Sequence, residues 1–62
     1  MSDFYNKMIE TLEATRTDVE RAEEGNKAAT SRVRKAMQDI KNLAQDVRKE
    51  MLELRDSGGK QA

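Results

Sequence analysis

The segment GNKAATSRVRKAM, residues 25–37, decides how this chain of 62 residues folds. Gly25 is the one glycine away from the C-terminal end, and it precedes the densest cluster of basic residues. Glycine supplies the left-handed conformation that closes a helix. Asn26, or Thr30 a turn later, belongs to the residue types that cap the start of the next one. The segment therefore predicts a break between two helices.

Composition restricts the chain to an all-α fold. Proline, cysteine and histidine are absent, and 39% of the residues are charged. No apolar run approaches the roughly 20 residues of a membrane span, and no signal region opens the chain. We therefore expect a soluble, cytoplasmic protein. A chain this short hides only about 60% of its unfolded surface, and without disulfides or zinc the remaining way to gain stability is oligomerisation.

Apolar and small residues recur at alternating steps of four and three in both halves, the pattern of an amphipathic helix. In the first half they are Met1, Tyr5, Met8, Leu12, Thr15, Val19 and Ala22. In the second half they are Val33, Met37, Ile40, Ala44, Val47, Met51 and Leu54, flanked by Ala36, Leu43 and Leu52. We call each of these two series of residues a seam, and the second seam is shifted by one residue, at Gly25, from the spacing of the first. If the first spacing continued through the turn unchanged, Glu50 would lie in the second seam. The absence of a glutamate from the shifted seam favours the shifted register.

The favoured fold is a helical hairpin forming one domain over residues 1–56. We expect a helix over about 3–24, a turn over 25–27, a helix over about 28–56 and a flexible tail over 57–62. The alternative is one continuous helix in a long coiled coil. Two observations support this alternative. In a hairpin, the acidic residues before Gly25 would lie at a helix C-terminus and Lys27 at a helix N-terminus, each unfavourable by ~0.3–1 kcal/mol. A glycine inside a continuous helix costs only ~1 kcal/mol.

One hairpin cannot enclose both apolar stripes, so we expect a homodimer, as a four-helix bundle or coiled coil, or a higher homo-oligomer. The predicted oligomer core consists of Tyr5, Met8, Leu12, Val19, Val33, Met37, Ile40, Leu43, Val47, Met51 and Leu54.

Charge divides the chain although the net charge is zero. Residues 1–26 carry three basic and seven acidic groups, and residues 27–62 carry nine basic and five acidic groups. A basic ridge recurs every seven residues at Lys27, Arg34, Lys41, Arg48 and Arg55. Such a ridge either pairs with glutamates of a neighbouring helix, such as Glu13, Glu20 and Glu23, or faces a polyanion.

The start of the second helix favours the polyanion, because five basic residues accompany a single acid there. These candidate contacts for nucleic-acid phosphates are Lys27, Arg32, Arg34, Lys35 and Lys41. Catalysis is not expected, since the carboxylates are spread over exposed helix positions without histidine, cysteine or a phosphate-binding loop. We expect no metal, cofactor, small-molecule substrate or membrane.

Three segments resemble a known family. GNKAA at residues 25–29, RVRK at 32–35 and LAQDVR at 43–48 are similar to the bacterial linker-histone-like proteins, the chlamydial-type histones and their short relatives, over roughly residues 6–56. The resemblance implies a nucleoid-associated protein that binds and compacts DNA. Long members carry a lysine- and alanine-rich C-terminal tail that this sequence lacks, so we expect weaker, non-specific binding through an oligomeric core. The alternative function is a structural or adaptor coiled coil that binds a partner helix and has no affinity for DNA.

Overall fold

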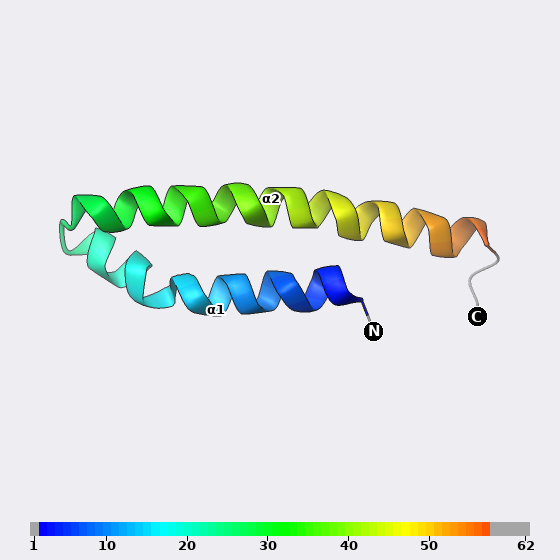
Figure 1. The fold of residues 1–62 in the computed structure, drawn as a ribbon, viewed down its shortest axis with the longest axis horizontal. Helices are drawn as coiled ribbons and strands as arrows, with labels where there is room; N and C mark the ends of the chain where they lie inside the picture. Colours follow the sequence, from blue (N-terminus) through cyan, green and yellow to red (C-terminus); the bar gives the residue numbers. More distant parts are fainter. Residues whose placement is uncertain (1, 58–62) are drawn as a thin grey trace.

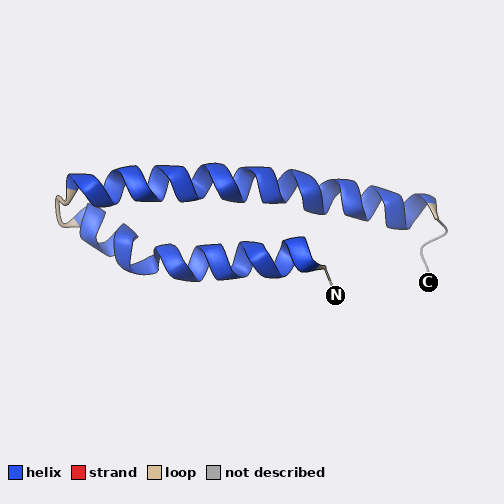
Figure 2. Ribbon diagram, viewed as in Figure 1, coloured by secondary structure: helices blue, strands red, loops and turns tan. Residues whose placement is uncertain are grey.

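The chain is a hairpin of two antiparallel helices (Figure 1; Figure 2). The computed structural model describes residues 2–57, in which α1 spans Asp3–Glu23 and α2 spans Lys27–Asp56. This range contains no strand. The predicted helical hairpin is confirmed, and the alternative of one continuous helix is wrong. Of the predicted flexible tail, residues 58–62 lie outside the described residues.

Gly25 and Asn26 build the turn. Gly25 has a φ of +101°, in the left-handed region that glycine adopts without a Cβ clash. The N–H of Gly25 donates to the carbonyl of Ala22, and the N–H of Asn26 donates to the carbonyl of Arg21, both at 3.0 Å. These two bonds form a Schellman motif, which satisfies carbonyls left unpaired at the end of α1.

Asn26 also starts α2. Its side-chain oxygen accepts a hydrogen bond from the N–H of Ala29 at 3.0 Å, so the residue that completes the end of α1 caps the next helix. Ser2 caps α1 in the same way, accepting from the N–H of Tyr5 at 3.1 Å. A side-chain cap stabilises a helix by about 0.5–2 kcal/mol. The caps and the Schellman bonds together outweigh the unfavourable charges beside the turn.

The two helices touch through mostly small side chains. Ala29 is completely buried, and Thr15 is 8% exposed. The Thr15 hydroxyl donates to the carbonyl of Leu12 at 2.7 Å, which satisfies its polar group. Half-buried residues continue this contact at helical spacing; they include Met8, Thr11, Asp18 and Ala22 on α1, and Val33, Ala36, Ile40, Leu43, Ala44, Val47 and Glu50 on α2.

This contact corrects the predicted seam of α2. The residues against α1 continue the spacing of the first helix through the turn, so that Ala36 and Glu50 lie in the contact. Met37 and Met51, predicted in the seam, are 40% and 47% exposed. The physical reason is that each helix of a single hairpin has one neighbour. Alanines allow the two backbones to approach closely, and the bulkier residues are left at the edge of the contact.

Glu50 is accommodated because it lies at the open end of the hairpin. Its carboxylate accepts a hydrogen bond from the Ser2 hydroxyl, and the residue is only half-buried. A carboxylate that keeps contact with water and gains a hydrogen bond avoids most of the cost of burying a charge. A glutamate in the seam is therefore no argument against this register.

Large apolar side chains remain on the surface of the hairpin. Those exposed are Phe4, Tyr5, Ile9, Leu12, Val19, Met37, Met51, Leu52 and Leu54. Some lie where α2, with 30 residues against 21 in α1, projects past the start of α1 (Figure 1). Within the predicted oligomer core, Met8, Val33, Ile40, Leu43 and Val47 are half-buried between the helices, and the other members are exposed. The oligomer itself stays a prediction.

Candidate nucleic-acid interface

Basic residues form a column on the side of α2 that faces away from α1. Lys27, Arg34 and Lys41 are seven residues apart, which is about two helical turns. All three are exposed. Within residues 2–57 none of them forms an ion pair, with α1 or with their own helix. The acidic residues of α1 thus leave this column uncovered in the single chain.

Lys35 widens the column around the helix. It follows Arg34 in the sequence and therefore points about 100° further around the axis. Its Nζ atom lies 4.0 Å from a carboxylate oxygen of Asp39, and its side chain is 81% exposed. Such a long, exposed ion pair contributes little and leaves the lysine available. We call Lys27, Arg34, Lys35 and Lys41 the basic face.

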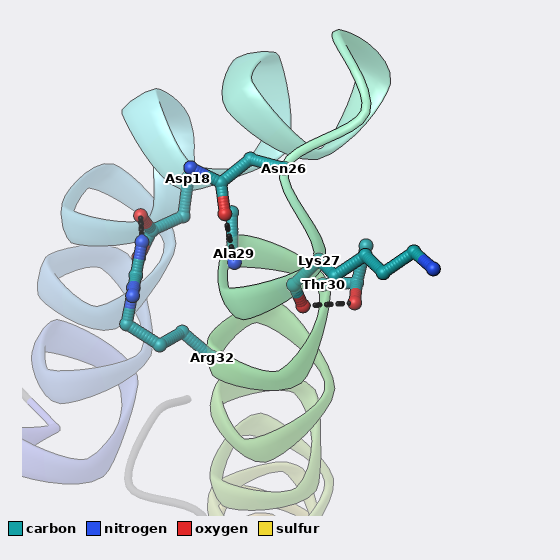
Figure 3. A network of polar contacts seen from close by, with 6 residues as sticks. All are labelled: Asp18, Asn26, Lys27, Ala29, Thr30 and Arg32. Carbon is teal, nitrogen blue, oxygen red and sulfur yellow. Dashed lines mark hydrogen bonds and ion pairs between the residues drawn. The ribbon is translucent and has the colours of Figure 1, made fainter.

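No acid interrupts the start of the basic face. Residues 27–38 of α2 contain four basic residues and no aspartate or glutamate, and the first acid is Asp39. The first turn of α2 has no acidic residue either, so the partial positive charge of the helix N-terminus is not compensated there. The Lys27 side chain extends from this turn away from both helices (Figure 3). The first half of α2 is therefore positive even though the net charge of the chain is zero.

Neutral polar side chains lie between the basic ones. Ser31, Gln38, Asn42 and Gln45 are exposed on α2. Hydroxyl and amide groups donate hydrogen bonds to phosphate and sugar oxygens as lysine and arginine do. The charge pattern alone missed them, because they carry no charge. Their spacing of seven residues, from Ser31 to Gln38 to Gln45, is the signal that could have identified them.

Arg32 differs from the other candidate contacts because it binds α1. Its Nε atom donates to Asp18 Oδ2 at 3.1 Å and its Nη2 atom to Asp18 Oδ1 at 3.0 Å. This bidentate ion pair joins the two helices beside the turn (Figure 3). The Arg32 side chain is 51% exposed and that of Asp18 is 24% exposed. A phosphate contact through Arg32 stays a prediction, and it requires the guanidinium to leave or share this carboxylate.

The ion pair shifts both ionisation equilibria. The hydrogen bond from Arg32, followed by the charges of Arg32 and Arg21, holds the pKa of Asp18 below its usual value despite an opposing effect of desolvation. The same hydrogen bond, and the negative charge of Asp18, raise the pKa of Arg32. Arg32 is thus cationic at every working pH. A change of pH can therefore break the ion pair only by protonating Asp18.

The pair predicts a pH-dependent stability. The folded-state pKa of Asp18 is depressed, so its contribution is present above the unfolded pKa of about 3.9 and is lost as the pH falls through the folded value. We expect Arg32→Ala to melt at a lower temperature than the wild type at neutral pH, and this difference to vanish in acid. Thermal melts followed by circular dichroism at several pH values measure it.

The matched control is Arg16→Ala. Arg16 pairs with Glu13 on its own helix, and both side chains are about two-thirds exposed, so its removal breaks no link between the helices. A difference for Arg32→Ala that does not begin to shrink as the pH falls below about 3.9, the pKa of an unfolded aspartate, would contradict the assigned ion pair.

Other kinds of site are not seen in the described part of the chain. Among residues 2–57, no cluster of acidic residues could hold a metal ion. Neither α1 nor α2 is long and apolar enough to cross a membrane. The first half of α2 stands out in the described range by its positive charge.

One comparison with known proteins bears on the role of this positively charged surface. A family model described as "Histone H1-like protein Hc1" matches residues 2–57, nearly the whole chain. The chain belongs to this histone H1-like family. The match confirms the family inferred from the GNKAA and RVRK segments. No curated protein and no solved structure matches the chain significantly.

Membership assigns a general role. Histone H1-like proteins are structural, DNA-binding proteins of the nucleoid, and the family is not one of enzymes. The family therefore implies DNA as the partner, and the basic face of α2 is the candidate surface for it.

Proposed function

We propose that the chain is a nucleoid-associated protein that binds DNA non-specifically, through contacts between the basic face and the phosphate backbone. The observation that carries the proposal is a set of basic residues on α2, Lys27, Arg34 and Lys41, that form no ion pair within residues 2–57, in a member of a histone H1-like family. Binding to phosphate releases condensed counterions, and this requires cations that are not already neutralised by the protein.

Backbone contact suits the shape of the chain better than base reading does. A helix-turn-helix reader places a short recognition helix in the major groove, supported by another short helix. Here α2 has 30 residues and lies against α1 along most of its length. A straight column of lysine and arginine along such a helix suits contact with phosphates, and phosphate contacts carry no sequence information directly.

The chain acts as a homo-oligomer in this proposal. A single hairpin leaves Leu12, Met37 and other apolar residues on its surface, and association is the way to cover them. Each added copy brings a further basic face, so weak contacts act together on one duplex or join two duplexes. Bridging and compaction of DNA follow from this multivalency.

The proposal predicts a steep salt dependence. A labelled duplex is titrated with the protein at about 50 and 200 mM salt and followed by fluorescence anisotropy. About four phosphate contacts per chain predict a fall in affinity of roughly 100-fold between the two conditions. The same titration with an unrelated duplex of equal length should give the same affinity within a few fold. No binding at the lower salt by a chain that is helical by circular dichroism would overturn the proposal.

A second function is favoured by one observation. The exposed apolar residues on both helices, such as Leu12 and Met37, suit an adaptor that binds a partner helix without any affinity for DNA. The titration separates the two functions, because an adaptor of this kind leaves the anisotropy of the duplex unchanged at both salt concentrations.

A further inference from the structure

A line of neutral polar side chains runs along α2 on the side opposite α1. Its members are Ser31, Gln38 and Gln45, seven residues apart and all exposed; we call them the polar line. Each follows by two positions a residue of the contact with α1, and those residues are Ala29, Ala36 and Leu43. Two positions turn through about 200° on a helix. The polar line therefore points almost directly away from α1.

Two hydrogen-bond donors follow each member of the polar line, three and four positions later. They are Arg34 and Lys35 after Ser31, Lys41 and Asn42 after Gln38, and Arg48 and Lys49 after Gln45. Residues three and four positions apart are neighbours on a helix surface, and the two members of each pair point about 100° apart. One member of every pair therefore lies on each side of the polar line. All of these side chains are exposed, and all but Asn42 are cations.

The acidic residues in this part of α2 lie beside the outer face and not on it. Those between Ser31 and Lys49 are Asp39 and Asp46, and each follows a member of the polar line by one position, which turns it about 100° away. Asp46 is half-buried. The Oε1 atom of Gln45 accepts a hydrogen bond from Nη1 of Arg48 at 3.1 Å, which uses the oxygen of the amide and not its N–H groups. The outer face thus presents hydrogen-bonding groups along its middle and cations on both sides.

We propose that α2 lies in the major groove of B-form DNA, with the polar line toward the base edges and the flanking donors on the phosphates of both strands. This inference rests on the proposed function, and it adds the groove and the form of the duplex. The major groove of B-form DNA is about 12 Å wide and admits an α-helix. Long continuous helices cross it in other DNA-binding proteins. Here α1 lies along the opposite side of α2 (Figure 1), so it stays outside the groove.

Such a contact carries little sequence information. Hydroxyl and amide groups both donate and accept hydrogen bonds, and every base pair presents acceptors in the major groove, including the N7 atom of its purine. Double-stranded RNA is disfavoured for a geometric reason, because its major groove is deep and too narrow for side chains to read. A surface that only neutralised phosphates would bind both kinds of duplex.

Three labelled duplexes of one sequence separate groove contact from surface contact. The first is DNA with 5-methylcytosine, the second is DNA with glucosylated 5-hydroxymethylcytosine, whose sugar fills the major groove, and the third is RNA. In anisotropy titrations at about 50 mM salt, we expect the glucosylated DNA and the RNA to bind at least about tenfold more weakly than the methylated DNA. All three carry the same phosphate charge. Equal affinities would therefore overturn the groove contact and leave non-specific phosphate binding intact, whereas no binding to any duplex would overturn both.

Two neutral variants test the polar line itself. Gln38→Ala with Gln45→Ala removes two of its members and keeps every charge, and alanine favours the helix. The matched control is Asn6→Ala with Thr17→Ala, which removes exposed polar side chains from α1. We expect the first variant to bind the methylated DNA at least about fivefold more weakly than the control does. The slope of affinity against salt should stay the same, because no phosphate contact by a cation is lost. Equal affinity of the two variants, both helical by circular dichroism, would overturn the contact between the polar line and the groove.

Discussion

A variant with glutamine at all four positions of the basic face is expected to lose duplex binding at about 50 mM salt, by at least ~100-fold. Non-specific affinity for DNA comes almost entirely from neutralised phosphates, and within residues 2–57 the column on α2 has no ion pair to release first. The slope of affinity against salt should fall by about one for each phosphate contact removed. Glutamine forms helices nearly as well as lysine and arginine, so the fold is retained.

The matched control replaces four basic residues outside the basic ridge by glutamine: Lys7, Arg16, Arg21 and Lys60. Both variants have the same net charge, and they differ only in where the positive charge was removed. The control should keep most of the duplex affinity in the same anisotropy titration. Equal losses in the two variants would show that total charge, and not the basic face, governs binding.

Ala29→Glu is expected to unfold most of the hairpin. Ala29 is completely buried where α2 leaves the turn, and a carboxylate there lacks both space and a partner. Burying such a group costs about 3 kcal/mol or more. A chain of about 60 residues is stable by only ~3–9 kcal/mol in total. Circular dichroism melts should show a loss of the cooperative transition, or a midpoint lowered by more than ~10 °C.

Ala28→Glu is the control for this substitution. Ala28 precedes Ala29 in the same turn of α2, and it is exposed. The same carboxylate there is close to the helix N-terminus, where negative charge is mildly stabilising. We expect its melting curve to match that of the wild type or to shift slightly upwards. Identical melts for the two variants would contradict the burial of Ala29.

Sequence reasoning succeeded where the structure depends on local chemistry. The turn at Gly25 needs a left-handed residue followed by a cap, and glycine and asparagine supply these within two positions. The basic face was visible for the same reason, because residues seven apart on a helix share a side whatever packs against it. Arg32 could not be separated from the other candidate contacts. Its ion pair with Asp18 depends on a residue 14 positions away on the opposite helix.

By itself the sequence determined two helices, the position of the turn, the division of charge and the histone H1-like family. Only the tertiary structure decided which side of α2 meets α1. Both registers contain Val33, Ile40 and Val47, and the position of Glu50 led the sequence analysis to favour the register that the structure corrects. The small side chains of Ala29 and Ala36 favour the observed register, because they let the two backbones approach closely. Close approach in a two-helix fold then left the larger apolar side chains outside the contact, where a further chain can reach them.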